Sequence, residues 1–234
     1  MKPIVKTAEE ADIGKWIVGE FPENYEDMIY VDTMCGSLGV FLRKSKSKLE
    51  VLNDTSHSLI QIYRAIRDEN ADFSRKLYNV KCTEESFQKY LSNNAKNFED
   101  YLDKAVNEFV LRKLSRGENK SVFSNRKVDW KKIAREILDL HMRLTDTFIM
   151  VKDPLEIIQK FNSPESLVYH TMHLPQKDQY LAKLSNALRN FQGKAIVSCG
   201  DQSVYKNFFE GWTLRRKMLT RLNKRKLHYV WKNF

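Results

Sequence analysis

Short apolar runs alternate with helical patterns in the first part of the chain. The runs at 28–32 and 48–52 have the composition of buried strands, and between them a turn with two glycines leads into a short helix at 36–43. A longer helix is predicted from Thr55 or Ser56 onward, because either hydroxyl can cap its first turn. Alternating strands and helices indicate a layered α/β sheet. The apolar face of the longer helix comprises Leu59, Ile62, Tyr63 and Ile66, and a further helix is expected at 8–19.

The segment 70–146 has a different pattern. Thr83 opens a helix in capping-box fashion, another helix ends near Leu114, and a third runs from Trp130 to Leu144 with an apolar stripe. No alternating strand pattern interrupts these helices. We therefore predict a mostly helical insert.

The α/β pattern resumes after the insert. Strands are expected at 147–151, 167–169, 195–198 and 227–231, and helices at 153–161 and 177–191. Residues 1–69 and 147–234 are thus predicted to form one α/β domain around the insert at 70–146. The fold class expected is α/β, with a sheet flanked by helices.

The composition is that of an ordinary globular protein, with 234 residues and 42% hydrophobic content. The chain has no apolar run of about 18 residues and no signal-peptide pattern at its start, so we expect no membrane segment and an intracellular protein. The three cysteines are widely spaced, which favours reduced thiols over a disulfide framework.

Positive charge is concentrated in a few segments, and the formal net charge is +10. Residues 215–226 carry seven cations and no acid. Such a run can neutralise nucleic-acid phosphates, although a solvated surface run is the alternative. The polar segment 115–127 is either a DNA-probing loop or a connector. The candidate DNA-binding residues are Arg116, Lys120, Arg126 and Lys127 in that segment, and Arg215, Arg216 and Lys217 near the end of the chain.

Polar residues follow the first two predicted strands. Asp32 ends the first strand, Gly36 lies in the turn after it, and Asn53 and Asp54 end the second strand. This arrangement suits an adenosyl cofactor, because glycine permits close backbone approach and a carboxylate at a strand end accepts hydrogen bonds from ribose. The alternative role for Asp54 is to cap the helix that begins near Thr55.

The order of these and later landmarks resembles that of the Dam-like adenine-N6 DNA methyltransferases, many of which are encoded by phages or prophages. The resemblance covers residues 8 to 234. It implies a Rossmann-like methyltransferase sheet, S-adenosylmethionine bound by Asp32, Gly36, Asn53 and Asp54, double-stranded DNA as partner, and a cytoplasmic location in a bacterium or phage-infected cell. The landmarks include Phe21-Pro22-Glu23-Asn24-Tyr25, Asn53-Asp54, Phe161-Asn162-Ser163-Pro164, Gly211-Trp212 and Tyr229-Val230-Trp231.

Three family motifs are altered. Ala8-Glu9-Glu10 replaces a Gly-Gly-Lys loop, and Leu38 replaces a glycine of the cofactor turn. The family motif Asp-Pro-Pro-Tyr, whose Asp receives the adenine amine, should follow Tyr169, but the chain has His170, Thr171, Met172 and His173. Thr171 has no charge to stabilise the developing ammonium. Binding of S-adenosylmethionine is therefore expected to be weakened, and no catalytic residue is assigned.

The leading hypothesis is a catalytically impaired methyltransferase relative that binds DNA, a protein partner such as an active methyltransferase, or both. One alternative is an active adenine-N6 methyltransferase that uses a displaced acid such as Asp153 or Asp178. A further alternative is a protein inhibitor or assembly subunit that uses the fold as a scaffold. A metal site at His170 and His173 is not expected, because neighbouring ligands are lacking.

Overall fold

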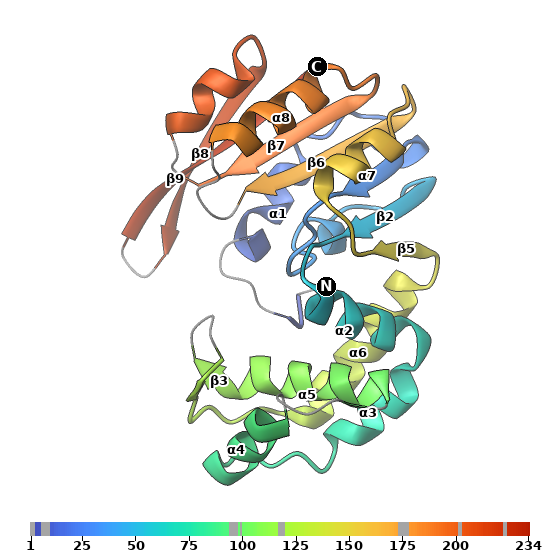
Figure 1. Cartoon of the computed structure of the whole chain (residues 1–234), viewed down its shortest axis with the longest axis vertical. Coiled ribbons are helices and arrows are strands. Elements are labelled where there is room, and N and C mark those ends of the chain that lie inside the picture. Colours follow the sequence, from blue (N-terminus) through green and yellow to red (C-terminus); the bar gives the residue numbers. More distant parts are fainter. Residues whose placement is uncertain are drawn as a thin grey trace. The chain divides into compact units, whose positions relative to one another are not determined.

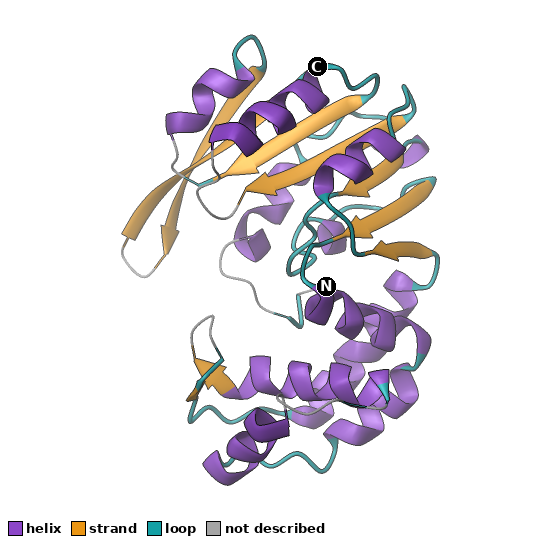
Figure 2. Ribbon diagram, viewed as in Figure 1, coloured by secondary structure: helices purple, strands orange, loops and turns teal. Residues whose placement is uncertain are grey.

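The computed structural model describes residues 3–5, 10–93, 98, 100–116, 120–172, 178–200, 203–221 and 224–234. The chain divides into two compact units. The first comprises residues 1–13, 36–42 and 56–149, and the second comprises residues 14–35, 43–55 and 150–234. Figure 2 shows that helices dominate the first unit and that most strands belong to the second.

A seven-stranded sheet has the order β5-β2-β1-β6-β7-β9-β8, and all of its strands except β5, of which only the last residue is included, belong to the second unit. β1 pairs in parallel with β2 and β6, and β6 pairs in parallel with β7, whereas β9 is antiparallel to both β7 and β8. The strand order reverses between β1 and β6, and open α/β sheets bind ligands at the carboxyl ends of strands beside such a switch point. The strands are β1 (Ile29–Asp32), β2 (Leu49–Asn53), β5 (Thr147–Met150), β6 (Ser166–Met172), β7 (Lys194–Cys199), β8 (Thr213–Arg221) and β9 (Lys224–Lys232).

One face of this sheet packs under two helices, α7 (Pro154–Lys160) and α8 (Asp178–Arg189), as Figure 1 shows. Alternate strand residues point to this face because the side-chain period of a strand is two. They form a buried core with the apolar stripes of the helices. The core includes Val31, Val51, Val168, Met172, Ala195 and Val197 from the strands, and Ile157, Ile158, Leu181, Leu184 and Leu188 from the helices.

The opposite face of the sheet carries buried aromatic and polar side chains. The ring of Phe21 lies 5.8 Å from that of Tyr30 and 6.5 Å from that of Tyr169, measured between centroids. Lys44 is buried on this side, with its ammonium 4.5 Å from the centroid of the Tyr30 ring. The second unit also includes the end of α1 (Glu10–Val18) and the short helices η1 (Tyr25–Asp27) and η3 (Ser203–Phe209).

The first unit is a bundle of helices with a small hairpin of two strands. Ser56 caps α2, since its hydroxyl accepts a hydrogen bond from the amide of Leu59 at 3.4 Å. In the core, the rings of Phe73 and Phe109 meet edge to face with centroids 5.4 Å apart. The elements are η2 (Phe41–Arg43), α2 (His57–Asp68), α3 (Asn70–Leu77), α4 (Glu84–Asn93), α5 (Tyr101–Leu114), β3 (Ser115–Arg116), β4 (Val122–Phe123) and α6 (Trp130–Leu144).

The predicted α/β class is confirmed, with a central sheet flanked by helices. Two strand predictions were incomplete. β6 does not end at Tyr169 but continues to Met172, because residues 167–172 pair along β7. β8 was not predicted, because its cationic sequence lacks a strand-like apolar pattern and its conformation comes from pairing with β9.

No helix in the described part of the chain is long and apolar enough to cross a membrane.

Candidate cofactor and nucleic-acid sites

Asn53 holds the carboxyl ends of β1 and β2 together. Its side-chain amide donates hydrogen bonds to the carbonyls of Thr33 and Lys152, both at 3.0 Å, and its side-chain oxygen accepts one from the amide of Lys152 at 2.9 Å. The side chain is fully buried. The predicted position of Asn53 at the strand end is confirmed, and its side chain joins the two strand ends through these bonds.

The two acids of the predicted cofactor site also belong to the second unit. Asp32, which is 1% exposed, accepts a hydrogen bond at 3.1 Å from the hydroxyl of Tyr30. Burial, reinforced by the charge of Asp32, raises the pKa of Tyr30 well above its usual value. Asp54 follows β2, is 6% exposed, and its amide lies 3.4 Å from the carbonyl of Met150. Asp54 thus occupies a position that fits a ribose-binding carboxylate, whereas Asp32 and Asn53 bond within the protein.

The glycine turn lies in the first unit. Gly36 has φ 46°, and its carbonyl accepts a hydrogen bond from Tyr63 Oη at 2.6 Å. Leu38 has φ 64° and is buried. This left-handed backbone favours glycine, which is the residue that the family resemblance expects at this position. The chain therefore keeps the backbone of a glycine turn while placing a branched side chain on it.

The segment matched to the Asp-Pro-Pro-Tyr motif continues a buried strand. The hydroxyl of Thr33 lies 2.8 Å from Nδ1 of His170 and donates to the carbonyl of Tyr169 at 3.1 Å. Thr171 accepts a hydrogen bond from Ser198 at 3.3 Å, and both His170 and Thr171 are 3% exposed. Met172 packs in the core beneath α7 and α8. His173, the fourth residue of the motif, lies outside the described residues.

A chain of hydroxyl groups connects β6 with β7. Ser198 Oγ lies 2.7 Å from the Tyr169 hydroxyl and also donates to Thr171. The strand register pairs Thr171 with Ser198, which explains the contact. The sequence did not predict this network. It shows polar residues in both strands, but the contact depends on the register between β6 and β7.

Lys120, one of the predicted DNA-binding residues of the first unit, is bound to an acid of its own unit. Its ammonium lies 2.7 Å and 2.9 Å from the two carboxylate oxygens of Glu108, which is buried on α5. Arg116 on β3 is exposed, as are Arg126 and Lys127. Lys120 thus differs from the other three cations of the segment, because it is bound to Glu108 whereas they are exposed.

Arg215, Arg216 and Lys217 lie in sequence on β8 and are exposed, but they do not form one cluster. Arg215 Nε is 3.7 Å from a carboxylate oxygen of Glu20, and the Lys217 ammonium is 5.9 Å from the centroid of the Trp16 ring. Because neighbouring strand residues face opposite sides, Arg216 points away from both.

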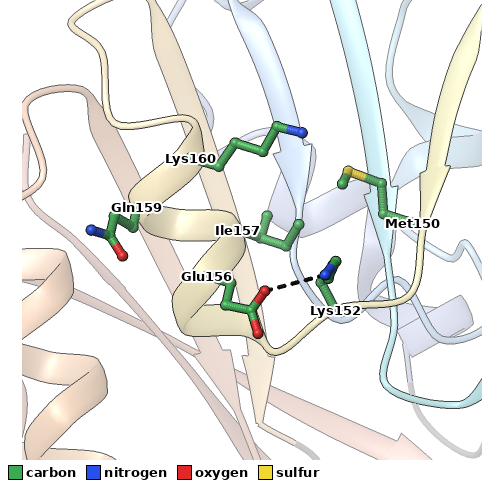
Figure 3. Close-up of a pocket in the computed structure, with 6 residues that line it drawn as sticks. All are labelled: Met150, Lys152, Glu156, Ile157, Gln159 and Lys160. Carbon is green, nitrogen blue, oxygen red and sulfur yellow. Dashed lines mark ion pairs between the residues drawn. The ribbon is translucent and has the colours of Figure 1, made fainter.

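A shallow pocket of about 400 Å³ lies between α7 and the segment before it (Figure 3). Lys152, Glu156 and Lys160 line it together with Met150, Ile157 and Gln159, and Lys152 and Glu156 form an ion pair at 3.5 Å. None of the predicted cofactor residues lines it. Within the described ranges, no group of three or more His, Cys, Asp or Glu side chains is arranged to hold a metal ion.

No protein-family model matches the sequence, and neither does any curated protein. Similar solved structures include a precorrin-8W decarboxylase from Methanobacterium thermoautotrophicum (10% identity, TM-score 0.48, covering 100% of this chain and 96% of that one). An rRNA methylase from Streptococcus thermophilus (10% identity, TM-score 0.46, covering 98% and 99%) and a putative methyltransferase from Escherichia coli (8%, 0.45, covering 98% and 89%) are also similar. Identities this low concern the fold alone, so we argue function from the residues of this chain.

Proposed function

We propose that this protein is a catalytically impaired relative of the adenine-N6 DNA methyltransferases and acts by binding DNA. The main support is that the residues of β6 at the position of the family's catalytic motif are buried and include no acid. An adenine amine must be received by an acceptor that can stabilise positive charge. His170 and Thr171 are instead buried in a strand and hydrogen-bonded to Thr33 and Ser198.

The basic strands at the end of the chain support the DNA-binding part of the proposal. Residues 211–234 contain no Asp or Glu, and the exposed side chains on β8 include Arg215, Arg216 and Lys217. Phosphate binding by such cations gives an affinity that falls steeply as salt rises. The partner proposed is double-stranded DNA, and a protein such as an active methyltransferase is a further partner consistent with loss of chemistry.

S-adenosylmethionine remains a proposed ligand, with Asp54 as the ribose-binding acid. When bound, this cofactor supplies an activated methyl group. On the protein side, Asn53 holds the two strand ends beside Asp54 through its bonds to Thr33 and Lys152. A carboxylate at a strand end binds ribose well, and we expect weak binding because the sequence has Leu38 where the family resemblance expects a glycine.

The alternative is an active methyltransferase with a displaced acid, and the position of Asp153 argues against it. The Asp153 carboxylate accepts a hydrogen bond at 2.7 Å from the amide of Leu155 and caps α7. Asp178 lies in the first turn of α8, where an acid is favoured by the helix dipole. Both acids therefore have structural roles.

Two measurements test the proposal. Labelled S-adenosylmethionine incubated with the protein and adenine-containing duplex DNA should give no methyl incorporation; incorporation that Asp153→Asn or Asp178→Asn abolishes would establish the alternative. Duplex binding should weaken with salt, and R215A/R216A/K217A should reduce the slope of log affinity against log salt by about 2 to 3. The matched control is K131A/K132A/R135A, which removes three exposed cations from α6. Salt-independent or absent DNA binding would overturn the proposal and favour a scaffold role.

A further inference from the structure

The last two strands form a ribbon that extends beyond the rest of the sheet (Figure 2). β9 pairs with β7 over Tyr229–Lys232, whereas its pairing with β8 continues to Lys224. The far end of the ribbon, which includes Lys217–Arg221 of β8, therefore consists of β8 and β9 alone, bonded to each other.

The ribbon has two different faces. On the inner face, Arg215 and Lys232 approach Glu20, at 3.7 Å and 3.1 Å, and the Trp16 ring meets that of His228 edge to face. The outer face is the opposite side of the ribbon, and it carries the residues that alternate along each strand with those of the inner face. Its cross-strand pairs are Leu214 with Trp231, Arg216 with Tyr229, and Met218 with Leu227, and Arg225 lies on the same face.

The outer face combines stacked rings, exposed apolar groups and cations. The ring of Tyr229, which is partly exposed, stacks on that of Trp231, with centroids 5.7 Å apart and an angle of 20° between their planes, and Trp231 itself is buried in the core. Met218 is 53% exposed next to them, and Arg216 and Arg225 are exposed. At the base of the same face, a pocket of about 300 Å³ is lined by the apolar residues Phe209, Trp212, Leu214 and Trp231 and also by Lys206 and Glu210.

We infer that this outer face, defined by Arg216, Met218, Arg225, Leu227 and Tyr229, binds unpaired nucleotides of a nucleic-acid strand. Flat aromatic and apolar groups stack on bases of any sequence, and cations between them hold the phosphates. The bases of an intact duplex are stacked on one another and cannot use such a surface. The absence of any acid from residues 211–234 makes the face complementary to a polyanion. The inference rests on the proposed function and adds unpaired nucleotides to the duplex DNA proposed there.

The test compares affinities of the full chain for a labelled oligothymidine and for a duplex of equal length, by fluorescence anisotropy at fixed salt. Tyr229→Leu keeps an apolar side chain but removes the ring, and should lower single-strand affinity by about fivefold or more without changing duplex affinity. Lys217→Ala removes a cation from the inner face of the same ribbon and should not lower single-strand affinity more than duplex affinity. Met218→Ala, at an exposed position that cannot disturb the core, should also lower only single-strand affinity.

Two results would overturn the inference, and only the second would also overturn the proposed DNA binding. If Tyr229→Leu and Met218→Ala change neither affinity while duplex binding persists, the outer face binds no bases and the proposed DNA binding survives. If neither oligonucleotide binds with a salt-dependent affinity, the proposed function fails together with the inference.

Discussion

The hydroxyl of Thr33 lies 2.8 Å from Nδ1 of His170 and joins the end of β1 to the interior of β6. The same hydroxyl donates to the carbonyl of Tyr169 at 3.1 Å. A hydroxyl has a single proton, so when it donates to Tyr169 the ring of His170 can only donate from Nδ1 in this contact. His170 is therefore part of the internal bonding of the sheet, at the position where the family resemblance expects catalytic chemistry.

Replacing Thr33 with valine should destabilise the protein without affecting DNA binding. The change leaves the Tyr169 carbonyl and the buried Nδ1 of His170 without their hydroxyl partner. The expected loss in the free energy of unfolding is about 1–3 kcal/mol. Urea denaturation of Thr33→Val measures it. Thr55→Val, at an exposed threonine, should stay within about 0.5 kcal/mol of the parent protein. Equal stabilities for the two variants would show that the contact contributes nothing.

A second buried contact, between Lys44 and Glu50, should be among the most sensitive in the second unit. The two groups are 2.5 Å apart and their side chains are 0% and 2% exposed. Lys44→Met leaves a buried carboxylate without its cation, which should cost about 3–5 kcal/mol. In contrast, the pair of Lys48 and Glu165 lies on the surface with side chains 60% and 63% exposed, so Lys48→Met should cost less than about 1 kcal/mol. Chemical denaturation of the two variants provides the comparison, and similar losses would contradict it.

Local patterns predicted several helices because their determinants are close in sequence, but they missed α3, and the helix expected at 36–43 is only the 3-10 turn η2 at Phe41–Arg43. The helix predicted at Trp130–Leu144 matches α6 at both ends, since Asp129 caps it by accepting from the amide of Lys132 at 2.9 Å and its apolar stripe is buried. The position of Asn53 at a strand end was likewise evident from an apolar run followed by polar residues.

What the sequence could not provide are contacts between distant residues. The partners of Asn53 include Lys152, which is 99 positions away. The length of β6 depends on pairing with β7, and β8 forms because β9 lies beside it. Consequently the run of cations was interpreted as one cluster, although the strand divides it between two faces.

The stability of the fold should decline at strongly alkaline pH because of Tyr30. Burial and the charge of Asp32 raise the pKa of Tyr30 well above 10, its value in an unfolded chain. Above that pH the unfolded state loses a proton that the folded state retains, so the free energy of unfolding falls as pH rises. Below pH 10 this group gives no pH dependence. Denaturation at pH 8 and pH 11 should show a smaller alkaline loss for Tyr30→Phe than for the parent protein, and an equal loss would exclude Tyr30 as the cause.

Lys120 and Arg126 should respond in opposite ways to substitution, although both were predicted to bind DNA. Lys120 binds both oxygens of the Glu108 carboxylate, which also accepts from Arg112 Nε at 2.7 Å. Lys120→Met should therefore lower the free energy of unfolding by about 1–3 kcal/mol while leaving DNA affinity unchanged, since the Lys120 ammonium is bound by the Glu108 carboxylate and not directed at a phosphate. Arg126 is exposed, so Arg126→Ala should leave stability within about 0.5 kcal/mol and reduce the salt slope of DNA binding by about 1. Denaturation and salt titration of the two variants separate the roles. A weaker salt dependence in Lys120→Met would mean that DNA displaces Glu108 from the lysine and that the segment contacts phosphates as a whole.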